Sequence, residues 1–401
     1  MQNKHFQSVF ADLSQDIAGE IPVDLIEEWV KSDGTPETHE KLLAPYKREG
    51  IIVSSDSAGL SKLSMNKSLI EVMKLVSEPK ELIHAYGKAI GGKPIGIWIA
   101  DNTQMFYPES IPAATVVGQM LALQKEAARC TVKVGLGIHV GLSYEIGGGL
   151  YGADADAVEQ VTEEESKAGE VMISAEVKKA IGDTFKVDKE RAEFFVLENV
   201  ADISPVAKGD DVVFPAPFDS GFADALRKLD ATNPEAIAAL EKERLIARTV
   251  VLVRVFHGHE PLLLDQLAQG VATNSLMNEV LRKYSANLVS ANGSLMIITL
   301  ESSSEAVDLS IALHATAQEA ELTCNIAVVS GEVLLFDMGQ GKEQIAGSPV
   351  NIASKLAEDT DERNALFLES SVIEHAPQHG LKTPFTVVKS GVTLSGIRVT
   401  F

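Results

Sequence analysis

The sequence contains little cysteine, little positive charge and no long apolar run. Its two cysteines, Cys130 and Cys324, lie in the unrelated contexts "AARCTVKVG" and "LTCNIAVV", and neither context has the spacing of a metal-binding motif. Both are therefore expected to be buried thiols in a reducing environment.

The chain has far fewer basic than acidic residues. It contains 35 Lys and Arg against 57 Asp and Glu, which gives a formal net charge of −22. Such a surface repels nucleic acid and anionic membranes, so neither is expected as a partner. A small anionic ligand would require a local cationic pocket or bound metal ions.

No apolar stretch approaches the ~20 residues that a membrane-spanning helix requires. The first segment, "MQNKHFQSVFADLSQDIAGE", also lacks the cationic and then apolar pattern of a signal peptide. We expect a soluble, cytoplasmic protein without a membrane span.

The length and the apolar content favour two globular units. A chain of 401 residues with 45% hydrophobic residues can bury two separate cores. Residues 1–46 are expected to form short helices with an apolar stripe around Trp29, as an arm for packing or dimerisation. Residues 203–248 are expected to be a linker with its own helix, which starts at Asn233.

The order of predicted elements occurs twice. Residues 47–202 and 249–401 each begin with a buried strand, "GIIVSSD" or "TVVLVRVF". In the first unit two helices are expected next, the second ending at "GKAIGGKP", and then the hairpin "IGIWIADNTQMFY" with its turn at Asp101. Gly141 aligns with Gly331 at an offset of 190, so a tandem duplication is the simplest explanation. The expected class is α+β, with two tandem α/β sandwich domains.

Two aspartates of the first unit stand beside predicted turns. Asp56 ends the strand "GIIVSSD" and is followed by "SAGLS", and Asp101 lies in the hairpin as "ADN". In their order and spacing, these segments resemble the catalytic domain of the class III adenylyl and guanylyl cyclases. The resemblance covers roughly residues 47–200 and 249–401, and it implies a ferredoxin-like, nucleotide cyclase-type fold for both units.

The resemblance also implies a metal site in the first unit. Asp56 and Asp101 would hold two Mg²⁺ or Mn²⁺ ions. The ions would lower the pKa of the ribose 3′-OH and neutralise charge on the phosphates. Unpaired N–H groups at a helix start attract a triphosphate, and the carboxylate beside them holds the metal against the same oxygens. The implied phosphate-binding residues are Ser57, Ala58, Gly59, Leu60 and Ser61.

The second unit lacks both acids. Arg254 or Val255 stands where Asp56 stands in the first unit, and Ser294 stands where Asp101 stands. The resemblance therefore implies no metal site in the second unit.

The second unit has instead the segment "AGSPVNIASKLAED". It resembles the family segment in which Asn orients the ribose and Arg, four residues later on the same helix face, stabilises the pentavalent phosphorus. Those positions are Asn351 and Lys355. The matching positions of the first unit are Asp156 and Gln160, in an acidic helix that should repel a triphosphate.

Members of this family build each active site across a dimer interface from these two sets of residues. One composite site is therefore expected, with Asp56 and Asp101 facing Asn351 and Lys355, and the opposite site is expected to be dead. The two units would pair within the chain or between two chains of a homodimer. The implied activity converts a purine nucleoside triphosphate to a cyclic nucleotide and pyrophosphate, the reaction of a nucleotidyl cyclase, a phosphorus–oxygen lyase.

Three positions depart from the family pattern. Lys355 replaces Arg, and an ammonium group cannot make the planar, bidentate contact of a guanidinium, which predicts slower chemistry. Ser290 and Gln344 stand where adenylyl cyclases have the Lys and the Asp that read the purine, so neither ATP nor GTP is indicated. The alternative function is an inactive pseudo-cyclase that binds a nucleotide or acts as a signalling scaffold.

Simpler interpretations of the same residues remain open. Asp56 and Asp101 also fit ordinary turn or helix-cap positions. The repeat also fits a pair of ferredoxin-like domains unrelated to cyclases, because a fold alone does not determine a function. His139, in "GIHVG", is interpreted as a structural, hydrogen-bonded histidine.

Overall fold

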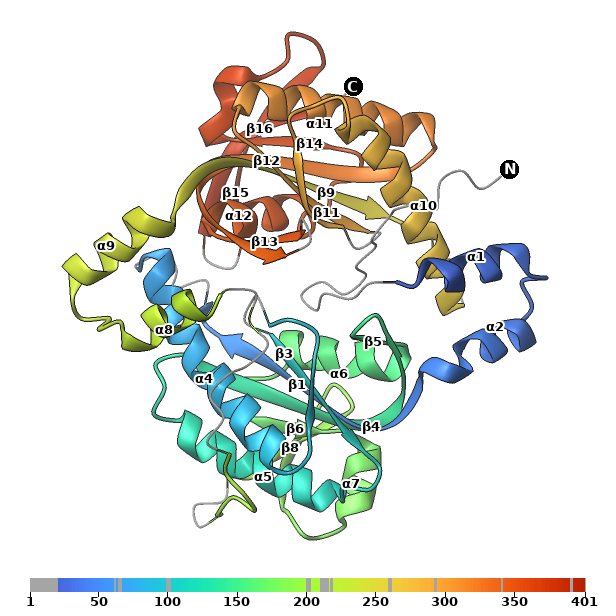
Figure 1. The fold of residues 1–401 in the computed structure, drawn as a ribbon, viewed down its shortest axis with the longest axis vertical. Coiled ribbons are helices and arrows are strands. Elements are labelled where there is room, and N and C mark those ends of the chain that lie inside the picture. The colour runs from blue at the N-terminus through green and yellow to red at the C-terminus, as the bar shows by residue number, and fades with distance from the viewer. Residues whose placement is uncertain are drawn as a thin grey trace.

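The computed structural model of the chain places most of its residues in two domains, each built on one mixed sheet (Figure 1). The structure describes residues 21–60, 63, 67–98, 102–199, 203–209, 216, 219–258, 262–291, 294–339, 342–389 and 392–400. Asp101 and Ser61, two of the predicted site residues, lie outside these ranges.

The first domain has eight strands in the order β2-β3-β1-β4-β6-β8-β7, with β5 paired to β4. The strands are β1 (Lys47–Ala58), β2 (Lys93–Ile95), β3 (Thr103–Pro108), β4 (Lys133–Ile146), β5 (Gly149–Tyr151), β6 (Val171–Ile173), β7 (Val187–Arg191) and β8 (Phe194–Leu197). The helices are α4 (Leu69–Ala89), α5 (Ala113–Ala127), α6 (Ala153–Glu164) and α7 (Ala175–Ile181).

The second domain repeats this order as β10-β11-β9-β12-β14-β16-β15, with β13 paired to β12. Its strands are β9 (Ile246–Phe256), β10 (Asn287–Ala291), β11 (Leu295–Leu300), β12 (Thr323–Gly339), β13 (Lys342–Ala346), β14 (Leu366–Glu369), β15 (Leu381–Lys389) and β16 (Val392–Thr400). Its helices are α10 (Leu263–Leu281), α11 (Ser303–Glu319) and α12 (Ser348–Ala357). Among the described strands, β4 and β6 of the first sheet and β12 and β14 of the second pair in parallel, and the other neighbouring strands pair antiparallel. This mixed pairing confirms two tandem α+β sandwich domains.

Strand register aligns the two domains residue by residue. Gly141 on β4 lies opposite Gly50, and its counterpart Gly331 on β12 lies opposite Arg248. Six residues further along, Asp56 therefore corresponds to Arg254, which decides between the two positions that the sequence left open. The register of β3 and β11 likewise makes Ser294 the counterpart of residue 101.

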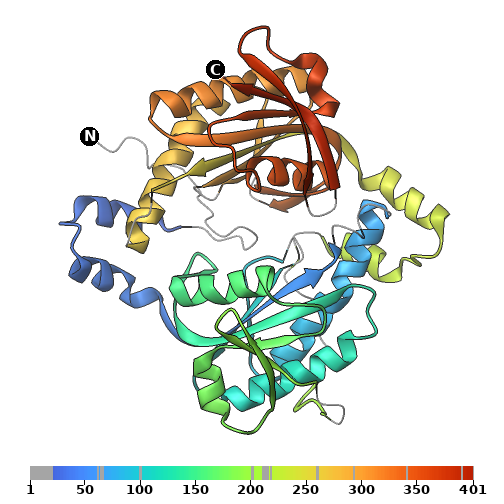
Figure 2. The ribbon, with the colours of Figure 1, turned by 180° about the vertical axis from the view of Figure 1, so that it is seen from behind.

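Each sheet has an outer and an inner face. In the first domain α4, α5 and α7 cover the outer face, where Val53 and Met105 are buried. The inner face carries α6, packed on Ile52 and Phe106. In the second domain α10 and α11 cover the outer face and α12 covers the inner one. Figures 1 and 2 both show α6 and α12 between the two sheets, so the inner faces are directed toward each other.

Helix α4 differs from the sequence-based expectation of two helices, because it runs without interruption through Pro79. A capping box starts it: the Ser68 hydroxyl accepts from the Glu71 backbone N–H, and the Glu71 carboxylate accepts from the Ser68 backbone N–H. Proline removes one helical hydrogen bond. The helix nevertheless continues, with buried residues from Ile70, in contact with α8, to Ile83 and Tyr86, which pack in the core of the first domain.

A short helical hairpin precedes each domain. Helices α1 (Val23–Lys31) and α2 (Pro36–Leu43) precede β1, and α8 (Ser220–Lys228) and α9 (Pro234–Arg244) precede β9. Both second helices have a proline at the first position and a side-chain cap, from Thr35 and Asn233. The expected arm and the expected linker are thus the same structural unit, and the internal repeat extends beyond the two sandwiches.

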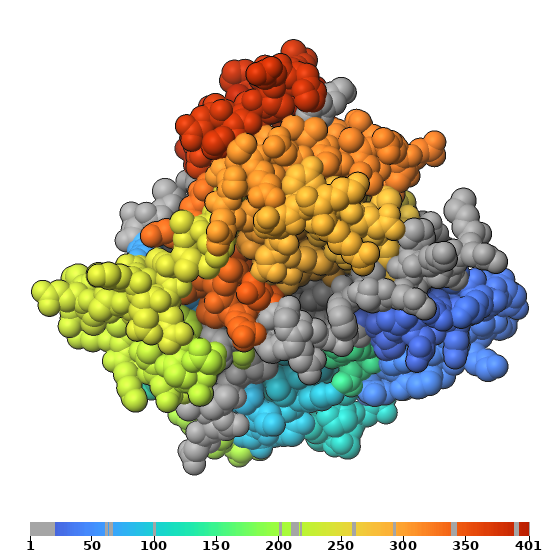
Figure 3. Space-filling view, turned by 45° about the horizontal axis from the view of Figure 1, so that its top comes forward, coloured from blue at the N-terminus to red at the C-terminus, as the bar shows by residue number. Residues whose placement is uncertain are grey.

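These hairpins join the domains reciprocally, on opposite sides of the molecule (Figure 3). We call the first contact the α1 cluster; it joins α1 to α10 and to the β4–β5 hairpin, and its buried residues are Ile21, Leu25, Ile26, Trp29, Leu43, Ile146, Tyr151, Leu264, Leu267 and Val271. We call the second the α8 cluster; it joins α8 to α4 and to the β12–β13 hairpin, and its buried residues are Ile70, Phe222, Leu226, Leu334 and Phe336.

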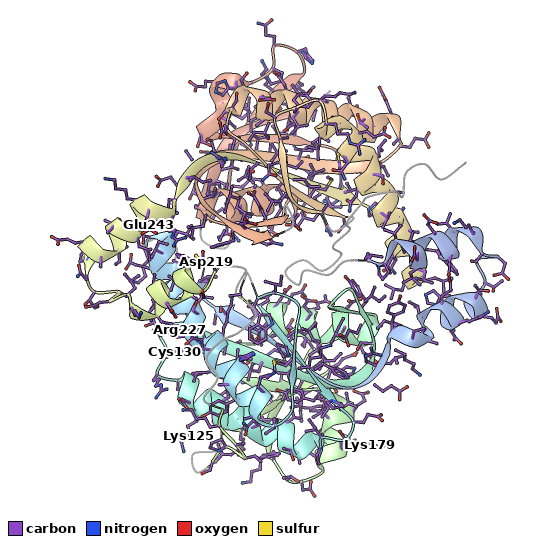
Figure 4. The ribbon with its side chains drawn as sticks, viewed as in Figure 1. Lys125, Cys130, Lys179, Asp219, Arg227 and Glu243 are labelled. Atoms are coloured by element: carbon purple, nitrogen blue, oxygen red, sulfur yellow. The ribbon has the colours of Figure 1, made fainter. Side chains whose placement is uncertain are left out.

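Polar contacts reinforce both clusters. Trp29 Nε1 donates to Asp265 Oδ1 at 2.9 Å, which ties α1 to α10. On the other side, Arg227 of α8 lies beside α4 (Figure 4) and donates from Nε to Glu81 Oε1 at 2.9 Å. The expected packing role of residues 21–46 is therefore found within one chain.

None of the described helices is both long and apolar enough to cross a bilayer.

Both thiols are buried, as the sequence predicts. Burial raises the pKa of Cys324 to about 12 and also raises the pKa of Cys130. Since the thiolate is the reactive form, we expect iodoacetamide to leave both residues unmodified in the native protein at mildly alkaline pH and to modify both after unfolding in guanidinium. Intact-mass spectrometry measures this directly, and rapid native labelling would contradict the buried positions.

Candidate active site between the two domains

Asp56 lies on the inner face of the first sheet, near the carboxyl end of β1. Side chains alternate along a strand, so Asp56 shares the side of Ile52, which packs under α6, while Ser57 points to the outer face. Asp56 is partly buried and its backbone pairs with Gly135 of β4. It is therefore a strand residue, and the turn or helix-cap interpretation does not apply to it.

The predicted phosphate-binding run begins inside the strand. Ser57 and Ala58 still pair with Val134 and Lys133 of β4, and the chain turns at Gly59, whose φ of +79° favours glycine. Leu60 packs toward α4, in the cluster that contains Val72 and Leu75. The Ser57 hydroxyl is buried on the side away from Asp56, so the Ser57 side chain is not directed to the candidate site.

Polar side chains continue the inner face beside Asp56. Asn102 directly precedes β3 and, like Gln104, lies on the inner face, 8% and 2% exposed respectively. Asn102 Nδ2 donates to Oε1 of Glu163, in the last turn of α6, at 2.5 Å. The sequence alone predicts only that Glu163 is one of several acids of that helix that repel a triphosphate. The signal it missed was that α6 ends at the carboxyl end of β1.

The residues predicted in the second domain come from neighbouring elements. Asn351 and Lys355 lie four residues apart on α12, so they share one side of the helix; Asn351 is exposed and Lys355 partly buried. Gln344 lies on β13, which leads into α12, and Ser290 lies on β10.

The two positions predicted to read the purine lie in adjacent segments with different surroundings. A hydrogen bond from Asn287 to Glu343 joins β10 to β13. Ser290 is opposite Ile297 on the inner face, whereas Gln344 is opposite Phe336, a residue of the α8 cluster. Gln344 is therefore directed toward the interface with the first domain.

The α8 cluster brings the two sets of elements together. It contains Ile70, from the start of α4, and Leu334 and Phe336, from the hairpin that leads into α12. The segment after Asp56 thus reaches α4 next to the elements that carry Gln344 and Asn351. In Figures 1 and 2 the carboxyl end of β1 and helix α12 lie on the same side of the molecule.

The position of the second domain that is equivalent to Asp56 has different chemistry. Arg254 stands where the first domain has Asp56, and its Nη1 donates to Ser294 Oγ at 2.7 Å. The pKa of the nearby Glu358 carboxyl is raised above its ordinary value because burial outweighs the opposing effects of a hydrogen bond from Ser354 and the charge of Arg254. A guanidinium at this point repels a divalent cation and so opposes metal binding at the position equivalent to Asp56.

His139 is buried between two carboxylates, with ring nitrogens 3.3 Å from Asp154 Oδ1 and 3.6 Å from Glu176 Oε2. Asp154 is on α6 and Glu176 on α7, so the imidazole lies between residues of these two helices. Neither ring nitrogen makes a hydrogen bond with the described residues, so the hydrogen-bonded state predicted for His139 is not found. No three His, Cys, Asp or Glu side chains converge as a metal site within the described ranges, to which Asp101 does not belong.

No protein-family model matches the sequence, and the search of curated proteins found no match. Among solved structures, a class III adenylyl cyclase-like ATP-binding protein from Pseudomonas aeruginosa matches 83% of this chain and 85% of its own length, at 12% identity and a TM-score of 0.51. The adenylyl cyclase CyaB from P. aeruginosa matches 39% of this chain and 97% of its own (16% identity, TM-score 0.33). The guanylate cyclase domain of RhGC from Catenaria anguillulae matches 38% and 98% (17% identity, TM-score 0.34).

At such low identity the first of these similarities shows the fold. It spans both sandwiches and agrees with the duplicated strand order. The chain therefore has the fold of the class III adenylyl and guanylyl cyclase catalytic domain, present twice in tandem.

Proposed function

We propose that the protein is a nucleotidyl cyclase, a phosphorus–oxygen lyase that converts a purine nucleoside triphosphate to a cyclic nucleotide and pyrophosphate at one site between its domains. The α8 cluster is the observation that supports this most, because it joins the segment after Asp56 to the hairpin that leads into α12 within one chain. In this proposal Asp56 faces Asn351 and Lys355 within one chain.

Two Mg²⁺ or Mn²⁺ ions would be held by Asp56 and Asp101. The residues present fit such ions, because the inner face beside Asp56 offers carboxylate and amide oxygens, the ligands that hard divalent cations prefer. When bound, the ions supply Lewis-acid activation of the ribose 3′-OH and neutralise charge on the leaving pyrophosphate.

The chain's own residues bind and orient the nucleotide. The backbone that follows Asp56 offers N–H groups to the phosphates. Asn351 orients the ribose, and Lys355, one helical turn later, places a positive charge on the transferred phosphoryl group. Ser290 and Gln344 offer a hydroxyl and an amide to the purine edge.

The direct test is incubation of the full chain with ATP, GTP, CTP or UTP and Mn²⁺, followed by mass spectrometry for a cyclic product and an assay for pyrophosphate. A purine cyclic product that disappears with EDTA is the expected result. Absence of both products with all four nucleotides would exclude catalysis.

The second candidate function is an inactive pseudo-cyclase that binds a nucleotide in a signalling role. The replacements at Lys355, Ser290 and Gln344 favour it, and a solved structure with this fold is described as an ATP-binding protein. This function predicts saturable nucleotide binding, measured by calorimetry, without turnover.

The Lys355→Arg variant separates the two functions. A guanidinium can add one charge-assisted hydrogen bond to the phosphoryl oxygens, worth about 1.5 kcal/mol or about tenfold in kcat. We expect kcat to rise by that factor in steady-state assays of pyrophosphate release, and Lys355→Gln to lower it. Equal kcat values for Lys355, Arg and Gln would remove this side chain from the mechanism.

A further inference from the structure

A fully buried asparagine lies beneath the inner-face helix of the second domain. Asn325 is on β12, directly opposite Arg254 of β9, and is 0% exposed. Opposed residues of an antiparallel pair are on the same face of the sheet, so Asn325 shares the inner face with Arg254, under α12. A side-chain amide at such depth is costly unless its N–H and C=O groups are hydrogen-bonded.

Three hydrogen bonds of this amide hold the end of α12 and the loop that follows it. Asn325 Nδ2 donates to the carbonyl oxygens of Ala357 at 3.0 Å and Glu362 at 2.9 Å. Asn325 Oδ1 accepts from the Ala365 backbone N–H at 3.2 Å. Ala357 is the last residue of α12. The last carbonyl groups of a helix have no partner within the helix, so Asn325 supplies a donor to one of them from the sheet.

The equivalent strand position of the first domain has no side chain. Gly135 corresponds to Asn325, since each pairs with an equivalent residue of the first strand of its domain. A Cβ atom on Gly135 would collide with Ser166, whose side chain fills that space just after α6. Ser166 Oγ donates to the Thr162 carbonyl oxygen, within α6, at 2.6 Å. At this strand position, the side chain that anchors the inner-face helix is thus a feature of the second domain.

The anchored end of α12 is the end that carries Lys355. Lys355 lies in the last turn, two residues before Ala357, whereas Asn351 lies one turn earlier. Helix ends open by local unfolding more readily than buried elements do, and a bond to the sheet holds the last turn in one position. A displacement of about 1 Å at a reacting group can cost about 10²-fold in rate. The anchor therefore bears on the side chain that is proposed to contact the phosphoryl group.

We propose that Asn325 is a positioning residue of the nucleotide site, which acts through Lys355 by fixing the last turn of α12 on the inner face of the second sheet. This inference rests on the proposed function, because Lys355 contacts the phosphoryl group only in that reaction. It gives a buried amide of the core a role in the rate of the reaction as well as in the stability of the fold.

The first measurement is hydrogen exchange of the full chain, read by mass spectrometry without nucleotide. The variant Asn325→Leu keeps the approximate size of the side chain and removes its hydrogen bonds. The matched control, Asn274→Leu, makes the same substitution at an amide of α10 that is also 0% exposed and makes no hydrogen bond with the described residues. Circular dichroism verifies that each variant is folded. Asn325→Ser, which retains one hydroxyl donor, replaces Asn325→Leu in both measurements if the latter does not fold.

We expect the backbone amides of residues 354–358 to exchange at least about tenfold faster in Asn325→Leu than in the wild type. In Asn274→Leu the same amides should exchange at the wild-type rate. Unchanged exchange in Asn325→Leu would overturn the anchor and leave the proposed function standing.

The second measurement is a double-mutant cycle between Asn325→Leu and Lys355→Gln, read as kcat and KM from pyrophosphate release. We expect Asn325→Leu alone to lower kcat by about tenfold with a smaller change in KM, and to change kcat by less than about twofold in the Lys355→Gln background. An equal loss of kcat in both backgrounds would overturn the positioning role, because Asn325 would then only support the fold. Absence of turnover in the wild type would overturn the proposed function and this inference with it.

Discussion

Replacing Asp56 with asparagine is expected to lower the rate of pyrophosphate release by at least about 10³-fold, a loss of roughly 4 kcal/mol of transition-state stabilisation. The amide keeps the size of the side chain but removes the negative charge that holds a divalent cation. Because Asp56 is at the end of β1 and only partly buried, the substitution should leave the sheet intact. Steady-state kinetics with Mn²⁺ and the responsive purine nucleotide measure the effect.

The matched control is Glu145→Gln, a partly buried acid of the same sheet that is bound to Arg48 at 3.1 Å and also to Lys93, at the far end of β4. We expect kcat for this control to remain within about twofold of the wild type, since these ion pairs lie far along the strand from Asp56 and act on local stability. Retention of activity in Asp56→Asn would contradict the cyclase mechanism. An equal loss of kcat in the control would indicate general destabilisation of the protein.

We expect the second large effect, a loss of folding free energy, when the central aromatic side chain of either interdomain cluster is truncated. Phe222 is 2% exposed, and its ring lies 5.8 Å from that of Phe336 between centroids. Trp29 is 4% exposed and bonds to Asp265. Truncation of a buried aromatic side chain to alanine costs about 3–5 kcal/mol of folding free energy. Urea denaturation followed by circular dichroism should show a loss of this size for Phe222→Ala and for Trp29→Ala.

Activity should distinguish the two variants. The α8 cluster joins α4 to the hairpin before α12, beside the proposed site, whereas the α1 cluster joins α10 to the β4–β5 hairpin, on the side of Arg254. At a temperature where both variants are folded, we therefore expect Phe222→Ala to lower kcat by about tenfold or more and Trp29→Ala to change it far less. Equal losses of kcat would mean that neither cluster orients the site selectively.

At the position of Arg254, the sequence predicts the correspondence between the two domains only to within one residue. The sequence placed either Arg254 or Val255 opposite Asp56 because the two strands share no identical residue there. Strand register identifies Arg254 as the counterpart of Asp56, because each lies six residues after the residue that pairs with the matched glycine, Gly141 on β4 or Gly331 on β12. A shift of one residue would have put a valine on the inner face and the arginine in the core.

Ser57 and Pro79 show the same limit. The motif suggested that Ser57 belongs to the site, yet strand alternation turns its side chain to the outer face and leaves only its backbone on the site. Two helices were expected where the structure has α4, yet that helix continues through Pro79 and has buried residues along its length. In both cases a local pattern was overruled by the element to which the residue belongs.

The sequence by itself determined the duplication, the α+β class and the chemical difference between the halves, since apolar periodicity and residue identity are local properties. Only the tertiary structure decided that the arm and the linker are equivalent hairpins, that each joins its domain to the other one, and that α6 brings Glu163 to Asn102. These features depend on the order in which strands pair and on the end of the sheet to which each helix returns. Contacts of this kind join residues that lie far apart in the chain, and no local pattern in the sequence specifies them.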